Sequence, residues 1–169
     1  MDAIWDAIMG ALEARADYFR IFDRYRLRPD AWLKVEVLHV LAAAGQAAGV
    51  RDLRPDRQGC DVSFATPDKE YWLAVKGLLT SYAGAARERS TIAAVEEVAR
   101  EMDKLRGLST LSGGAPALLL AAFAFGPEPR ERNEWRSQLL RFEAKGFEQA
   151  RFQTIELAPQ RECQLYLFV

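Results

Sequence analysis

Hydrophobic residues along the chain follow two periodicities, which together predict alternating helices and strands. Helices are predicted where apolar residues recur every three or four positions, in residues 2–25, 31–48, 91–105 and 133–144. Strands are predicted where β-branched and aromatic residues form short runs, in residues 50–53, 59–64, 70–77, 117–125, 151–157 and 164–169. The order of these elements is typical of an α/β fold in which helices flank one mixed sheet.

Two of the predicted elements are apolar almost throughout. Residues 117–125 form an unbroken apolar run, which is typical of a central parallel strand buried on both faces. The helix at residues 31–48 is apolar around most of its circumference, so we expect it to be largely buried. Glu36 lies in the middle of that helix, where a carboxylate is costly without a partner. Either Glu36 pairs with a basic side chain or reaches a helix edge, or it faces the neighbouring strands as a functional acid.

Two of the strand runs flank a Thr-Pro-Asp turn at residues 66–68, and this arrangement predicts a β-hairpin. With the hairpin centred on that turn, Asp61 lies opposite Ala74. Side chains alternate between the faces of a strand, so Lys76 projects from the same face as Ala74 and Asp61. The hairpin therefore brings a carboxylate close to an amine. The alternative is an ordinary amphipathic hairpin, with Asp61 capping a turn and Lys76 solvated.

Composition narrows the class of protein. The chain has 169 residues, of which half are hydrophobic, so it fits one domain with a proper core. The net charge of −1 gives no global attraction to nucleic acid, so any nucleic-acid site has to be a local basic patch. Two cysteines are too few for a disulfide framework, and the single histidine, His39, excludes a histidine-rich metal cluster. We find no signal peptide and no membrane span, and we expect a cytoplasmic protein.

The pattern formed by Asp61 and by Ala74, Val75 and Lys76 resembles the PD-(D/E)xK nuclease superfamily, also called restriction endonuclease-like. In that superfamily an Asp at the start of one strand precedes an acid-x-Lys triplet on the next strand. Glu36 matches the Glu that many members carry on the helix before the core strands. The resemblance implies that Asp61 and Glu36 hold Mg²⁺ or Mn²⁺, and that Lys76 activates water or stabilises charge during phosphodiester cleavage.

The resemblance covers residues 30–125, where the order helix, three strands, helix and strand matches the core of that fold. It implies an α/β fold with a restriction endonuclease-like central mixed sheet flanked by helices. We expect a single domain over residues 1–169. An extra N-terminal helix occupies residues 1–28, and a C-terminal helix with a strand hairpin occupies residues 126–169.

The segment after the hairpin carries candidate contacts to nucleic acid. Thr80 and Ser81 follow the second strand, and Arg87 and Arg89 lie in a charged segment rich in small residues. Hydroxyl and guanidinium groups are common partners of backbone phosphates. The resemblance implies DNA as the substrate in preference to RNA. The alternative is that these side chains are simply solvated.

Ala74 stands where the superfamily has Asp or Glu. Either this residue is a substitution that silences a nuclease, or the chain is a natural pseudonuclease, or the acid has moved to Glu70. Glu70 lies about 13 Å from Ala74 along an extended strand, which is too far for shared metal coordination. We therefore discount the third interpretation.

Two functional hypotheses follow from these residues. The first is a metal-dependent nuclease, inactive as it stands if Ala74 replaces the required acid. The second is a catalytically inert module, such as a regulator or an immunity-type protein, that binds a protein partner or another copy of itself. An unrelated α/β protein whose hairpin only mimics the motif is a further interpretation.

Overall fold

The computed structural model describes residues 2–45, 47–57, 59–80 and 91–169. The described residues form five helices: α1 (Asp2–Glu13), α2 (Ala16–Tyr25), α3 (Asp30–Gly45), α4 (Thr91–Ser112) and α5 (Pro129–Glu143). They also form six strands: β1 (Arg51–Pro55), β2 (Val62–Ala65), β3 (Glu70–Leu79), β4 (Ala115–Phe125), β5 (Gln149–Ala158) and β6 (Arg161–Phe168).

The six strands build one mixed sheet in the order β1-β2-β3-β4-β6-β5. Strands β1, β2 and β3 form an antiparallel meander, and β3 runs parallel to β4. Helix α4 makes the crossover between β3 and β4, as a parallel connection requires. Strands β4, β6 and β5 are antiparallel neighbours. The predicted α/β class, the mixed sheet and the C-terminal hairpin are therefore confirmed.

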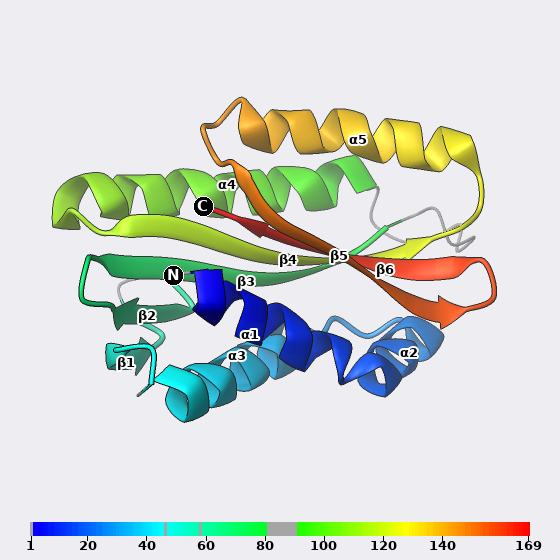
Figure 1. Ribbon diagram of the computed structural model, residues 1–169. Helices are drawn as coiled ribbons and strands as arrows, with labels where there is room; N and C mark the ends of the chain where they lie inside the picture. Colours follow the sequence, from blue (N-terminus) through cyan, green and yellow to red (C-terminus); the bar gives the residue numbers. More distant parts are fainter. Residues whose placement is uncertain (1, 46, 58, 81–90) are drawn as a thin grey trace.

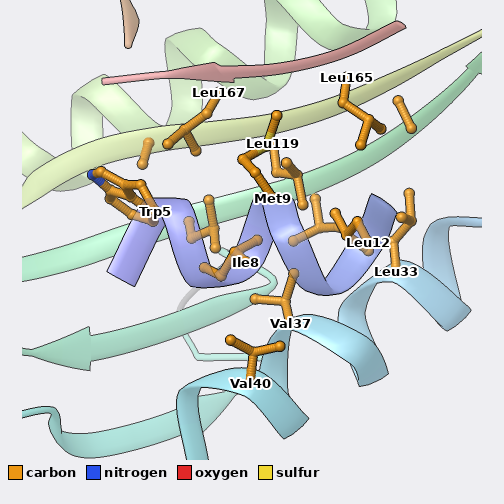
Figure 2. Close-up of a cluster of buried hydrophobic side chains, with 14 of the residues drawn as sticks. Trp5, Ile8, Met9, Leu12, Leu33, Val37, Val40, Leu119, Leu165 and Leu167 are labelled. Atoms are coloured by element: carbon orange, nitrogen blue, oxygen red, sulfur yellow. The ribbon is translucent and has the colours of Figure 1, made fainter. Parts of the chain in front are cut away.

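Helices cover both faces of the sheet (Figure 1), with α4 and α5 on one face and α1, α2 and α3 on the other. Figure 2 shows the second of these layers, where Ile8 and Leu12 of α1 belong to one buried cluster with Val37 of α3 and Leu119 of β4. Neighbouring side chains of β4 enter the two layers alternately. Leu119 belongs to the layer of α1, α2 and α3, and Leu118 belongs to the cluster beneath α4 and α5. The prediction of a central strand buried on both faces is confirmed.

The single N-terminal helix predicted at residues 2–25 is wrong, because the chain forms two helices that separate at Arg15. The change of direction lets α2 pack on the far end of the sheet. There Phe19 stacks on Phe123, with ring centroids 5.6 Å apart. The buried carboxylate of Asp23 accepts two hydrogen bonds from Arg161 of β6, at 2.7 and 2.8 Å. Tertiary contacts thus outweigh the continuous helical pattern.

Two other predictions about the helices need correction. Helix α3 is buried only on one side, since the side chain of Val35 is 61% exposed and His39 is also exposed. Helix α4 continues through Gly107 to Ser112, beyond its predicted end at residue 105, because a lone glycine weakens a helix without ending it. None of the described helices combines the length and the apolar character needed to cross a membrane.

Gly77 allows α3 to begin directly beside β3. A Cβ atom at this position would lie 2.3 Å from Cδ of Pro29, a ring atom that cannot rotate away. The Asp30 carboxylate accepts a hydrogen bond of 3.1 Å from the Gly77 backbone N–H. Close backbone approach therefore ties the start of α3 to the strand that carries Lys76.

We predict opposite effects for one substitution at two glycines. Gly77→Ala should lower the free energy of unfolding by roughly 1–3 kcal/mol, because the added methyl group overpacks the contact with Pro29. Gly107→Ala should raise it by about 0.5–1 kcal/mol, because the added Cβ meets no atom within 4 Å outside the adjoining backbone of α4. Urea unfolding followed by circular dichroism measures both changes. A Gly77→Ala protein as stable as the natural chain would contradict the packing described here.

Candidate functional site

The hairpin has the predicted register. Val62 pairs with Leu73, so Asp61, one residue before β2, lies level with Ala74 of β3. The Asp61 backbone N–H extends this pairing by donating to the Leu73 carbonyl at 3.1 Å. Strand pairing alone thus positions the Asp61 side chain beside β3.

The Asp61 carboxylate turns toward β3 and meets Lys76, as predicted. Its Oδ2 atom accepts a hydrogen bond of 2.9 Å from the Val75 backbone N–H and lies 3.2 Å from Lys76 Nζ. The side chains of Asp61 and Lys76 are 19% and 20% exposed, so water reaches both groups only in part. Their interaction is consequently less screened than an ion pair on the open surface.

A second amine, which sequence reasoning missed, reaches the same carboxylate. Lys34 of α3 places Nζ 3.4 Å from Asp61 Oδ1 and 2.5 Å from Asp56 Oδ1. The hydrogen bond to Asp56 and the charge of Asp61 raise the pKa of Lys34 above its ordinary value. We call Lys34, Asp56, Asp61 and Lys76 the Asp61 cluster. Its two ammonium groups balance its two carboxylates.

Ala74 is buried in the apolar layer beneath α4 and α5. Its exposed fraction is 1%, and it belongs to the same cluster of buried side chains as Val98 and Leu120. A carboxylate at this position would leave water and enter an apolar layer, which is costly unless a cation accompanies it. The position of the acid in the superfamily pattern is therefore part of the hydrophobic core in this chain.

The structure does not bring Glu36 to the hairpin. Lys34 faces the hairpin, and Glu36 lies two residues farther along α3, about 200° around the helix. The Glu36 carboxylate lies 3.6 Å from Nε of Arg15 and lines a recess with Ala7 and Ala11 of α1. The interpretation of Glu36 as an acid paired with a basic side chain holds, and its expected place facing the hairpin is wrong.

The predicted contacts to nucleic acid receive no support from Thr80. Its side chain is fully buried, its hydroxyl donates to the Ala124 carbonyl at 2.9 Å, and its backbone N–H donates to Phe123. Thr80 thus joins β3 to β4, and its hydroxyl is turned away from any phosphate on the surface. Ser81, Arg87 and Arg89 lie outside the described residues.

The residues near Asp61 do not fit the Mg²⁺ or Mn²⁺ ion that the resemblance implies. Both oxygens of the Asp61 carboxylate already lie beside ammonium groups, and the next expected ligand is replaced by a methyl group. A metal ion about 2.1 Å from either oxygen would be repelled by Lys34 and Lys76. Within the part of the chain that the structure describes, no three His, Cys, Asp or Glu residues gather in a way that could hold a metal ion.

Cys60, beside Asp61, does not supply a nucleophile. Burial of the thiol and the neighbouring Asp61 charge raise its pKa to about 11, and its Sγ donates to the Arg57 carbonyl at 3.1 Å. The thiolate is the reactive form of cysteine, so this thiol is inert near neutral pH. Cys60 is therefore not a candidate nucleophile.

We predict that the Asp61 cluster contributes to stability. Asp61→Asn should lower the free energy of unfolding by about 1 kcal/mol, because the amide loses the ionic contacts with both lysines while keeping an acceptor for Val75. Glu96→Gln, an equivalent change at an exposed position of α4, should have almost no effect. Urea unfolding of both variants tests this difference. Equal stabilities of the two variants would contradict a structural role for Asp61.

Comparison with known proteins finds no relative of this chain. No family model matches the chain, and no curated protein or solved structure matches it significantly.

Proposed function

We propose that this chain is a catalytically inert module with a restriction endonuclease-like core, and that it acts by binding a protein partner. The order of elements from α3 to β4 and the placing of Asp61 and Lys76 support the relation to that core. The contacts of the Asp61 carboxylate support the loss of catalysis. Both parts of the proposal rest on the same hairpin.

The observation that carries this proposal is that Lys34 and Lys76 together engage the Asp61 carboxylate. In a metal-dependent site this carboxylate would need to face a divalent cation, with a second acid close by. Here the ammonium groups neutralise it, and the second position holds buried Ala74. The cluster therefore stabilises the fold with the charges that a nuclease would use for chemistry.

The surface near Lys76 has mixed charge, which favours a protein partner over a polyanion. Arg28 lies 3.3 Å from Asp30 and 3.7 Å from Glu97, so this guanidinium is balanced by two carboxylates. Lys34 is balanced in the same way by Asp56. Phosphate binding at this surface would have to compete with these ion pairs.

The alternative is a metal-dependent nuclease that cleaves DNA. One observation favours it, since the chain keeps an acid and an amine within 3.2 Å at the ends of paired strands, with Asp61 and Lys76 in the motif positions. In that case Lys76 would stabilise charge in the transition state, and Mg²⁺ or Mn²⁺ would be held at Asp61.

A cleavage assay separates the two functions. Plasmid and single-stranded DNA are incubated with Mg²⁺, Mn²⁺ or EDTA and with the natural chain, Ala74→Glu or Lys34→Met. We expect no metal-dependent cutting by any of the three proteins. Lys34→Met removes the competing amine without placing a charge in the core, so this variant remains informative if Ala74→Glu does not fold.

Metal-dependent cutting by the natural chain would contradict the proposal and support the nuclease. Cutting that appears only in a variant, and is lost when Lys76→Ala is added to that variant, would mean that the natural site is complete for catalysis except for one group. Circular dichroism spectra of all the variants serve as the folding control. Contaminating nuclease would be revealed by cutting that persists after Lys76→Ala.

A further inference from the structure

The two edges of the sheet differ in how well they are protected against pairing with another strand. The edge strand β1 is five residues long, ends in Pro55 and has an irregular register between Arg51 and Arg54. Asp52 within it has a positive φ of 52°. Short length, proline, charge and irregular backbone are the features that prevent strand addition at an edge.

The opposite edge strand, β5, lacks two of these features, since it is neither short nor interrupted by proline. It is ten residues long and contains no proline, and it pairs regularly with β6 from Arg151 to Glu156, between register shifts at its two ends. Figure 1 shows β5 crossing in front of the other strands, above α1 and α2. The Arg151 guanidinium donates to the Ala150 carbonyl at 2.8 Å, so this carbonyl already has a partner within the chain. No strand among the described residues pairs with this edge, so it can serve as a template for an added strand.

The two sides of the β5 edge have different chemical surroundings. On the α1 side, a recess of about 300 Å³ is lined by Asp6, Glu13 and Arg151, among other residues. Arg151 is paired with Asp6 at 2.6 Å and with Asp2 at 2.7 Å. Glu13 adds a third carboxylate to this region, so three carboxylates stand against one guanidinium. This side is therefore acidic.

On the other face of the strand, the ring of Phe152, a residue that also borders the recess, packs against Tyr166 of β6, with ring centroids 5.0 Å apart. Half of the Phe152 side chain remains exposed. Because side chains of an extended peptide alternate between faces, an added strand would place every second residue near α1 and the others near Phe152. The edge thus fits alternating basic and apolar residues.

We propose that the β5 edge binds an extended segment of a protein partner in which basic and apolar residues alternate. The segment adds as a seventh strand, with its basic side chains near Asp6 and Glu13 and its apolar side chains near Phe152. This inference rests on the proposed function, because it names the partner class and the surface of an inert binding module. Backbone hydrogen bonds supply affinity in this mode, and the alternating side chains supply specificity.

The charges distinguish this partner from two other occupants. A second copy of the chain would offer β5 itself, whose one basic residue, Arg151, is already engaged by α1. Nucleic acid would bring phosphates to the carboxylates of Asp6 and Glu13, which repel them. The acidic recess therefore selects a basic protein segment.

Binding is measured with a fluorescent, acetylated and amidated peptide of about eight residues in which Lys and Val alternate. We expect saturable binding by the full chain, and at least about tenfold weaker binding of a Glu-Val peptide of equal length. Two further peptides carry N-methyl groups on either all the Lys or all the Val nitrogens. Because alternate backbone N–H groups of a strand point to opposite edges, one methylated peptide should lose binding and the other should retain it.

Matched variants locate the peptide on the protein. Glu13→Lys should weaken binding of the Lys-Val peptide about fivefold, and Phe152→Ser should weaken it as well. Glu143→Lys and Ile92→Ser, equivalent changes on α5 and α4, should leave the affinity unchanged. These four positions are exposed, so the fold is expected to tolerate each change.

Four results would overturn the inference: no binding of the Lys-Val peptide, equal binding of both methylated peptides, stronger binding of duplex or single-stranded DNA at the same edge, or dimerisation through β5 in sedimentation. Cleavage is assayed separately without peptide. Peptide binding by a protein that also cuts DNA would refute the inert function alone. Absence of both activities would refute only this inference.

Discussion

The parallel pairing of β3 with β4 is the constraint on which most of the structure depends. Nine residue pairs, from Tyr71 with Ala115 to Leu79 with Phe123, place both strands at the centre of the sheet. A parallel pair needs a long crossover, which α4 provides, and helices then have to cover both faces. The two apolar layers follow from this pairing, and the burial of Ala74 follows from the layer beneath α4.

The burial of Ala74 and the partial exposure of Lys76, two residues apart on β3, support a structural role for the Asp61 cluster. Ala74 pairs with Leu118 in the centre of the sheet, where an acid would lack both water and a cation. Two residues farther along β3, the side chain of Lys76 is partly exposed and lies 3.2 Å from the Asp61 carboxylate. Lys34 completes the neutralisation from α3, so the carboxylate is balanced by the chain itself. The same architecture with an acid at position 74 would require an added cation.

Local patterns predicted the local features of this protein well. The hairpin register followed from the turn and the alternation of side chains, so the meeting of Asp61 with Lys76 was predictable. The long apolar run of β4 also identified the centre of the sheet. Such features depend on residues that are close in sequence or on burial alone.

Features that depend on how helices dock were not predictable. The pattern of α3 showed that Glu36 needed a partner, but the flank that faces the hairpin is fixed only by packing, and Lys34 occupies it. A lone lysine in an apolar helix was the signal for this role. No proline or glycine marks the break between α1 and α2 at Arg15. Contacts of Phe19 and Asp23 with the sheet impose this break instead. The Thr80 hydroxyl was likewise satisfied by a distant strand.

The central claim, that ammonium groups and not a metal ion balance the Asp61 carboxylate, is tested most directly by NMR spectroscopy with Mn²⁺. The paramagnetic ion broadens amide signals close to a carboxylate that binds it. In ¹⁵N-labelled natural chain we expect the Asp61 and Val75 amides to broaden no earlier in the titration than the amide of exposed Glu96. Selective broadening of Asp61 and Val75 at lower Mn²⁺ concentrations would contradict the account and indicate a metal site at the hairpin.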